Sequence, residues 1–132
     1  MDCIFCKIVS GEIPSKKIYE DEYTYAFLDI AKDIDGHTLV IPKKHCKNIL
    51  DCDEETLSHV MNTIRKISKH YVECLGFDGV NILNANEASA EQSVFHLHFH
   101  IIPRKNDDGL HTFPKLPGAK VELDDMRRIL KI

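Results

Sequence analysis

The residues of this chain best suited to chemistry are three closely spaced histidines, His96, His98 and His100. Polar and apolar residues alternate from 95 to 102, which is the period of a β-strand with one face in the core. The three imidazoles then share a face with Val94. The opposite face of this strand carries Phe95, Leu97, Phe99 and Ile101. Side chains on one face lie about 6–7 Å apart, so the row can span a phosphate group and its attacking nucleophile.

Clustering of the histidines favours a functional row over a solvent-exposed strand face. A face that only met water would carry Lys, Thr or Glu, because these residues are soluble without titrating near neutrality. The residues alone leave two kinds of chemistry open. The row could hold a catalytic metal ion, or it could supply a nucleophile with its phosphate-binding partners. In the second case the middle ring, His98, is the nucleophile because it has a partner on both sides.

Several segments of the chain resemble one protein family. His96-Leu97-His98-Phe99-His100-Ile101-Ile102 resembles the His-x-His-x-His-x-x signature of the histidine triad (HIT) family of nucleotide hydrolases and transferases, in which x is apolar. Flanking Gln92-Ser93-Val94 and Pro103-Arg104 are similar too. Earlier segments resemble the family in the same order: Cys3-Ile4-Phe5-Cys6, Phe27-Leu28-Asp29-Ile30 and Gly36-His37-Thr38-Leu39-Val40-Ile41-Pro42. The resemblance covers most of residues 1–104 and is greatest to the Hint-like bacterial branch.

This resemblance implies a reaction and a substrate class. In the family, the residue matching His98 attacks the α-phosphate of a nucleoside phosphoramidate or (di)nucleoside polyphosphate. Water then releases a nucleoside monophosphate from the nucleotidyl-histidine. His100, Ser93 and Gln92 would bind the phosphate. The resemblance also implies that purine nucleotides are the preferred small-molecule partners and that the chain forms a homodimer.

Further roles follow for residues earlier in the chain. The residue matching His37 supports the hydrogen bonds of the triad in the family. Asp29, with apolar Phe27 and Ile30 beside it, is expected to form a nucleoside pocket, with a carboxylate for the ribose hydroxyls and apolar walls for the base.

Cys3 and Cys6 form a C-x-x-C pair that indicates a metal site. A redox C-x-x-C usually follows a strand, and this pair is too near the N-terminus for one. Two thiolates are half of a tetrahedral zinc site, and spacing alone does not choose the other two ligands among eight histidines. The resemblance implies His45 and His96, which gives a closed, structural zinc site.

Three residues depart from the family pattern in the segment before the triad. Ala85 stands where relatives carry an Asn or Gln that faces the phosphate, while Glu87 and Glu91 replace two glycines. Glu91 is the more serious change because it lies just before Gln92-Ser93, and a carboxylate about 5 Å from a phosphate is repulsive by a few kcal/mol at an effective dielectric near 20. These departures predict a changed substrate class, a lower activity, or a nucleotide-binding module with little turnover.

Composition bounds the class of protein. A chain of 132 residues, 43% of them hydrophobic, is expected to form a single domain, with the motifs in 1–104 and a tail in 105–132. A net charge of -4 argues against sequence-independent nucleic-acid binding. Five cysteines without a regular spacing argue against a disulfide scaffold. The absence of a signal peptide or a membrane-length apolar run leads us to expect a cytoplasmic protein without membrane contact.

Residue patterns predict the elements that position the motifs. Helical spacing of apolar residues over 54–75 predicts a long helix, with Asp53 as its N-cap and Gly76 after its end. Short helices are expected at 4–10 and 121–132, and strands at 18–20, 23–29, 37–42, 79–83 and 95–102. The predicted fold is α+β: an antiparallel sheet of about five strands, with the long helix and the C-terminal helix on one face.

Overall fold

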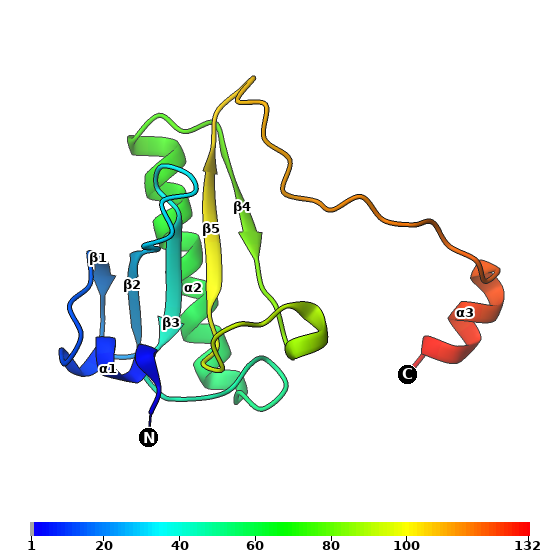
Figure 1. Ribbon diagram of the computed structural model, residues 1–132, viewed down its shortest axis with the longest axis horizontal. Helices are drawn as coiled ribbons and strands as arrows, with labels where there is room; N and C mark the ends of the chain where they lie inside the picture. The colour runs from blue at the N-terminus through cyan, green and yellow to red at the C-terminus, as the bar shows by residue number, and fades with distance from the viewer. Residues whose placement is uncertain (1) are drawn as a thin grey trace.

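A five-stranded antiparallel sheet forms the centre of the computed structural model, which describes residues 2–132 (Figure 1). Its strands lie in the order β1-β2-β3-β5-β4. They are β1 Lys17–Glu20, β2 Thr24–Leu28, β3 Thr38–Pro42, β4 Gly79–Leu83 and β5 Phe99–Arg104. The helices are α1 Ile4–Ser10, α2 Glu54–Lys69 and α3 Leu123–Leu130, with a π-helical turn η1 His70–Cys74 and a 3₁₀ turn η2 Ala88–Ala90. The predicted α+β class and the antiparallel sheet are confirmed.

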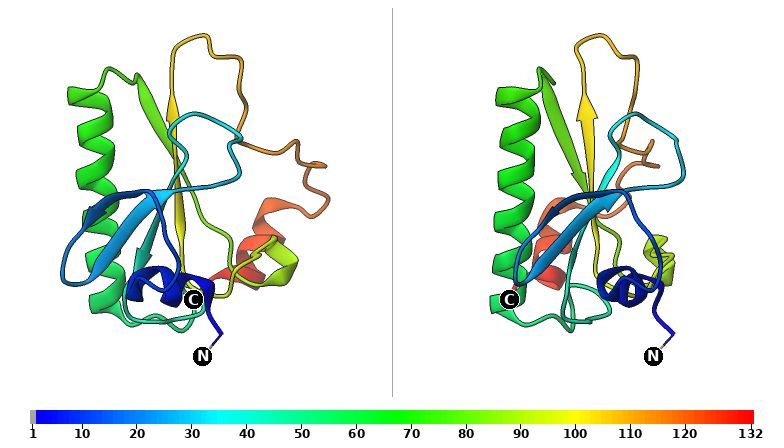
Figure 2. Two further views of the ribbon diagram at one scale, coloured as in Figure 1. Left: turned by 60° about the vertical axis from the view of Figure 1, so that its left-hand side comes forward. Right: turned by 90° about the vertical axis from the view of Figure 1, so that its left-hand side faces the viewer.

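Alternating side chains of the strands divide the core into two clusters, one on each face of the sheet. Helix α2 covers one face and the short helix α1 lies on the other (Figure 2). The α2 cluster contains Ala26, Val40, Val60, Ile64, Ile67, Leu97, Phe99 and Ile101. The α1 cluster contains Cys3, Phe5, Ile8, Tyr25, Phe27, Leu39 and Ile41. The N-terminal C-x-x-C helix is therefore held against the sheet face that carries the histidine row.

Strand β5 has the predicted alternation but begins later than predicted. Leu97, Phe99 and Ile101 are buried on the α2 face, whereas Phe95 is 46% exposed, so its predicted place in the core is wrong. Regular pairing with β3 runs only from Val40 opposite Phe99 to Thr38 opposite Ile101. Before that point the Leu97 N–H donates to the Cys46 carbonyl at 2.8 Å, so a loop replaces the strand ladder.

The long helix predicted over 54–75 begins as α2 at Glu54 but changes type after Lys69. The Asp53 carboxylate accepts from the Thr56 N–H at 3.0 Å, which confirms the N-cap. From His70 the predicted α-helix continues as a π-turn, closed by the Leu75 N–H donating to the His70 carbonyl at 3.2 Å. Gly76 follows with φ +82, as a helix-ending glycine should. No helix within residues 2–132 has both the length and the apolarity needed to cross a membrane.

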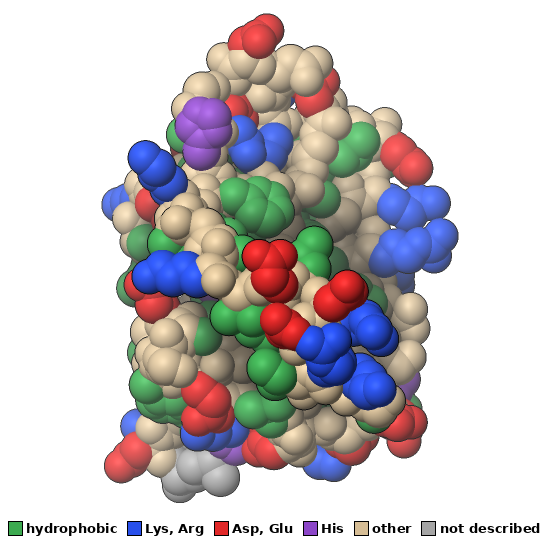
Figure 3. Space-filling model, turned by 90° about the vertical axis from the view of Figure 1, so that its right-hand side faces the viewer, with side chains coloured by type: hydrophobic (Ala, Val, Ile, Leu, Met, Phe, Trp, Pro, Cys, Tyr) green, Lys and Arg blue, Asp and Glu red, His purple; other side chains and the backbone are tan. Residues whose placement is uncertain are grey.

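The C-terminal helix is not where it was predicted. Helix α3 lies away from the sheet at the end of an extended tail (Figure 1), and none of its residues is buried. The side of the molecule that carries it presents acidic, basic and apolar side chains together (Figure 3). Phe113 and Leu123 are each 82% exposed. The amphipathic pattern of 121–132 predicted a helix correctly, but it did not determine which surface the helix packs on.

Two non-glycine residues before the triad have positive φ. Glu91 is left-handed at φ 70 and ψ 25, and Glu87 has φ 80 and ψ 157, a region that is essentially restricted to glycine. Such conformations cost on the order of 1–3 kcal/mol for a residue with a Cβ. The two positions at which the family resemblance implies glycine are thus strained in this chain.

The strain at Glu91 predicts an unusual order of stability for two variants. Glu91→Gly is expected to have a free energy of unfolding about 1 kcal/mol above that of Glu91→Ala, because glycine has no Cβ to clash in the left-handed region. Urea denaturation of both variants measures the difference. The same pair of substitutions at exposed Asp35, which is not among the positive-φ residues, is the control, and there glycine should not be favoured. An Ala variant as stable as the Gly variant at position 91 would contradict the proposed strain.

Candidate functional site

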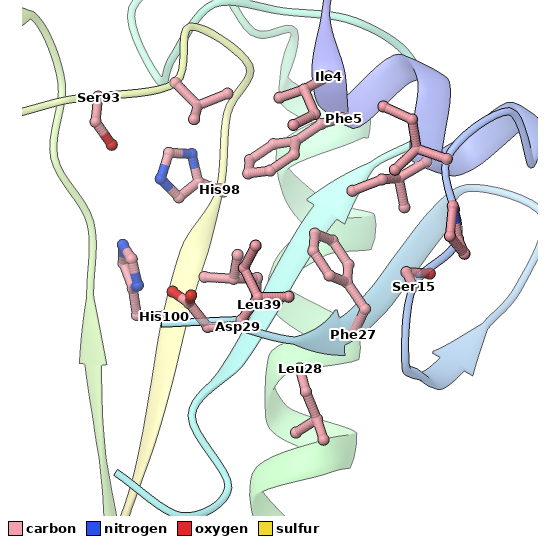
Figure 4. Close-up of a pocket in the computed structure, with 15 residues that line it drawn as sticks. Ile4, Phe5, Ser15, Phe27, Leu28, Asp29, Leu39, Ser93, His98 and His100 are labelled. Atoms are coloured by element: carbon pink, nitrogen blue, oxygen red, sulfur yellow. The ribbon is translucent and has the colours of Figure 1, made fainter. Parts of the chain in front are cut away.

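A pocket of about 300 Å³ lies on the α1 face of the sheet. Ser93, His98, His100 and Asp29 line one side of it, and apolar side chains of α1, β2 and β3 line the other (Figure 4). The apolar part includes Ile4, Phe5, Ile8, Phe27 and Leu39. The pocket thus combines an apolar chamber with a polar edge that carries two imidazoles, a hydroxyl and a carboxylate.

His98 presents one ring nitrogen to this pocket. Its Nδ1 lies 2.8 Å from the His96 carbonyl oxygen, which can only accept, so Nδ1 carries the proton and Nε2 keeps a free electron pair. The ring packs edge-on against Phe5 at a centroid distance of 5.2 Å. Burial lowers the pKa of His98, partly offset by the hydrogen bond to His96 and the charge of Asp29. These contacts maintain a neutral, oriented imidazole suited to nucleophilic attack.

His100 ends a chain of hydrogen bonds that begins at Asp33. The Asp33 carboxylate accepts from His37 Nδ1 at 2.7 Å, and His37 Nε2 lies 2.8 Å from His100 Nδ1. Burial, with repulsion from His98 and His37, lowers the pKa of His100 to about 4. Bonding to His37 on one side leaves Nε2 of His100 for the pocket.

Four side chains converge in the geometry of a zinc site. His45 Nδ1 and His96 Nδ1 are 3.2 Å apart, and the sulfur–nitrogen separations are 3.4 Å for Cys3–His96, 3.4 Å for Cys6–His45 and 3.6 Å for Cys6–His96. Tetrahedral zinc requires edges of about 3.3 Å between nitrogens and about 3.6 Å between sulfur and nitrogen. The His96 Nε2–H donates to the Pro42 carbonyl at 2.8 Å, so its Nδ1 electron pair faces the thiols. Cys3, Cys6, His45 and His96 therefore fit the zinc ion that was expected.

The three histidines of the row do not converge on one point. Within residues 2–132, only two groups of three or more His, Cys, Asp or Glu residues have ligand atoms that all lie within 4.8 Å of one another. The first is Cys3, Cys6, His45 and His96, and the second is Asp29, His37 and His100. In the second set the two imidazole nitrogens are 2.8 Å apart, which is a hydrogen bond and too close for two ligands of one ion. The alternative of a catalytic metal held by the whole row is wrong.

Not every predicted residue reaches the pocket. Ser93 lines it, while Ile30 lies at its rim, 88% exposed. Gln92 does not face it, because its amide already makes four hydrogen bonds within the surrounding loops. Glu91 and Ala85 lie in a separate hollow on the other side of His100.

Sequence reasoning missed four residues that support the site. Asp33 orients His37, and Phe5 packs on His98. Asn84 donates to the His98 carbonyl at 2.9 Å, and Asn48 binds Gln92. Asp33 and His37 lie in and next to a turn, where spacing along the chain does not predict pairing. Asn48 had no local signal for this role, since the two side chains to which its amide group donates, Glu87 and Gln92, lie about forty residues along the chain.

A model of the HIT domain matches residues 10–107, which include the histidine row and most of the pocket. The chain belongs to the HIT family. An uncharacterised HIT-like protein of Methanocaldococcus jannaschii is 50% identical over 98% of both chains. Adenosine 5'-monophosphoramidase of Saccharomyces cerevisiae is 39% identical over 98% of this chain and 78% of its own length. A zinc-bound histidine triad protein of Mycobacterium smegmatis has the same fold, with a TM-score of 0.80, 42% identity and coverage of 89% and 85% of the two chains.

The ligand geometry predicts the metal content of this HIT protein. The purified chain is expected to hold about one zinc ion, and His45→Ala or Cys6→Ser should remove most of it, because three ligands without a fourth bind zinc weakly. Mass spectrometry of the metal content measures this. Cys74→Ser, at an exposed cysteine outside the ligand group, is the matched control and should retain its zinc. Full zinc content in His45→Ala would remove His45 from the ligand set.

Burial of His100 predicts a loss of stability in acid. An unfolded chain takes up a proton at His100 near pH 6.5, whereas the folded chain does so only near pH 4. Between these values the unfolded state binds more protons, so stability falls as the pH falls. Chemical denaturation from pH 7 to 4.5 should therefore show a steeper loss for the wild type than for His100→Asn. Parallel curves would mean that His100 is not held in its neutral form.

Proposed function

We propose that this HIT protein is a hydrolase that releases a nucleoside monophosphate from a nucleoside phosphoramidate or a (di)nucleoside polyphosphate through a covalent nucleotidyl-His98 intermediate. The observation that carries the proposal is the free Nε2 electron pair of His98, which faces the pocket because Nδ1 is bound to the His96 carbonyl. Activity of the yeast relative, named for its action on adenosine 5'-monophosphoramidate, supports the substrate class.

The reaction proceeds in two displacements at phosphorus. His98 Nε2 attacks the α-phosphorus, a phosphorus–nitrogen bond forms, and the bond from phosphorus to the amine or phosphate leaving group breaks with a proton passing to that group. Water then attacks the same phosphorus and gives up a proton, while the phosphorus–nitrogen bond breaks and His98 leaves as a neutral ring. The attack needs a neutral imidazole, which burial of His98 favours.

Phosphate charge is stabilised from the polar edge of the pocket. The Ser93 hydroxyl can donate to a phosphate oxygen next to His98 (Figure 4). His100 can donate through Nε2 when the Asp33–His37–His100 chain holds one extra proton, with His37 donating to Asp33 and His100 to the phosphate. A bound anion at one end and a carboxylate at the other favour that proton. His37 is thus a supporting residue for His100.

The apolar part of the pocket suits a nucleoside. Phe27 and Leu39 offer flat and aliphatic surfaces to a base, for which purine is the proposed choice, and Asp29 can accept hydrogen bonds from ribose hydroxyls. Ile30 can close over the nucleoside from the rim. The zinc ion, when bound, would tie the N-terminal helix to the row and hold His96, without taking part in the displacement.

The homodimer and the cytoplasmic location expected from the sequence remain part of this proposal. A nucleotide-binding module with little turnover is the second candidate, and the departures Ala85 and Glu91 favour it. Both lie beside His100, where the leaving group would depart. The molar mass from light scattering tests the dimer. Release of a nucleoside monophosphate separates the hydrolase from the binding module.

His98→Asn is expected to lower kcat for an adenosine phosphoramidate by at least about 10³-fold, because it removes the attacking nitrogen. Zinc content should not change, since His98 is outside the ligand group. Release of AMP by chromatography and zinc by mass spectrometry are the measurements. His70→Asn, at an exposed histidine in η1, is the matched control.

Trapping the nucleotidyl-enzyme with a labelled substrate gives the sharper test of the intermediate. Acid-labile nucleotidyl label that maps to His98 supports the covalent mechanism. Nucleotide binding without any AMP release would instead identify a binding module, and label on another histidine would overturn the assignment of the nucleophile.

A further inference from the structure

The loop that carries Ser93 and His98 needs a support outside the sheet. Residues 84–98 connect β4 to β5 without pairing to either neighbouring strand. Ser93 nevertheless has to hold its hydroxyl at a fixed place beside His98, because a displacement of about 1 Å can cost on the order of 10²-fold in rate. Hydrogen bonds to the loop that follows His45 hold it in place.

Two buried amides join these loops. Asn48 is 1% exposed and Gln92 is 5% exposed. Asn48 donates to the Gln92 side-chain oxygen at 3.1 Å, and the Gln92 amide donates to the carbonyls of Lys47 at 2.7 Å and Val94 at 3.0 Å. Buried amides in a fully bonded network fix the backbone that they bind. Gln92 therefore holds the chain on both sides of Ser93.

Glu87 completes this network from the exposed side. One carboxylate oxygen accepts from Asn48 Nδ2 at 2.6 Å and the other from Lys47 Nζ at 2.9 Å, while the Glu87 N–H donates to the Gln92 side-chain oxygen at 2.8 Å. The carboxylate thus points at the neighbouring loop and away from the pocket. Its backbone nevertheless adopts the conformation that favours glycine. Both carboxylate oxygens of Glu87 are bonded although its backbone is strained, which points to a use for the carboxylate.

We propose that Glu87 is a positioning residue for the phosphate-binding loop, acting through Asn48 and Gln92 on Ser93. The inference rests on the proposed hydrolase function, and it gives a role to a residue that departs from the family pattern. The bond to Asn48 carries the effect. The ion pair with Lys47 adds little, because both of its side chains are nearly half exposed and solvent screens them.

Because the Asn48 bond and the Lys47 ion pair contribute differently, substitutions that remove one or both should lower kcat by different amounts. Glu87→Ala removes both bonds, so kcat for the adenosine phosphoramidate should fall about tenfold or more, while KM changes less than about threefold. Glu87→Gln can still accept from Asn48 and should stay within about threefold of the wild-type kcat. Lys47→Met removes only the ion pair and should do the same. Glu20→Ala, which removes an equally bonded carboxylate on the distant strand β1, is the matched control.

The outcomes separate positioning from loss of folding. Glu87→Gly relieves the backbone strain and also removes the carboxylate, so it should be at least as stable as Glu87→Ala and equally slow. Wild-type kcat in both Glu87→Ala and Glu87→Gly would overturn the proposal. So would a loss in Lys47→Met as large as in Glu87→Ala, because the ion pair would then carry the effect.

A second readout does not depend on turnover. Hydrogen exchange of the segment 88–95 should be faster in Glu87→Ala than in the wild type or Glu20→Ala, because the loop has lost its support. If the wild type released no AMP, the proposed function would fail. Faster exchange in Glu87→Ala would still show that Glu87 holds the loop in place. Unchanged exchange in Glu87→Ala would overturn the inference whatever the activity.

Discussion

The hydrogen bond from His98 Nδ1 to the His96 carbonyl connects the scaffold of this protein to its chemistry. His96 is fixed through its side chain, with one ring nitrogen on the Pro42 carbonyl and the other among the thiols and His45. Its carbonyl is therefore held rigidly, and the ring of the next histidine on the same face is oriented by it. The metal-ligand group and the proposed nucleophile are in this way one continuous structure.

Burial determines how the imidazoles behave. All three rings of the row lie on the α1 face of the sheet, and burial lowers the pKa of each of them. A buried imidazole remains neutral at ordinary pH, and a neutral ring is the form that can attack phosphorus or bind zinc. Phe5 contributes to the burial of two of these rings, since it packs edge-on against both His96 and His98. The low dielectric around the row thus keeps both the ligand ring of His96 and the proposed nucleophile His98 in the neutral form.

The loop before the row shows how a fold tolerates a locally unfavourable backbone. Glu87 and Glu91 occupy positive-φ positions, yet they differ in what surrounds them. Glu87 is anchored by Lys47, Asn48 and Gln92, whereas Glu91 lies exposed beside the hollow next to His100. The predicted repulsion of a phosphate concerned Glu91, which lines that hollow and not the pocket of His98. The Glu87 carboxylate is bonded to the neighbouring loop. Departures from a family pattern at neighbouring positions can have unrelated physical consequences.

Local pattern was enough to predict the parts of this protein that depend on residues near one another in the chain. Alternation put Leu97, Phe99 and Ile101 in the core and the histidines opposite them, and the Asp53 cap and Gly76 bounded the long helix. Family resemblance added His45 and His96 to the C-x-x-C pair, which spacing alone had left undecided, and the ligand geometry fits that choice.

Only the tertiary structure decided the contacts that join distant segments. Asn48 binding Gln92, Phe5 packing on His98 and the Leu97 N–H bonding to Cys46 all depend on which loops the sheet brings together. The same is true of the exposed Phe95 and of α3, whose amphipathic pattern predicts a helix but names no partner surface. Periodicity records which face of an element is apolar, because that is a property of neighbouring residues. What the face meets depends on the path of the whole chain, and so the support of the site could be found only in the folded protein.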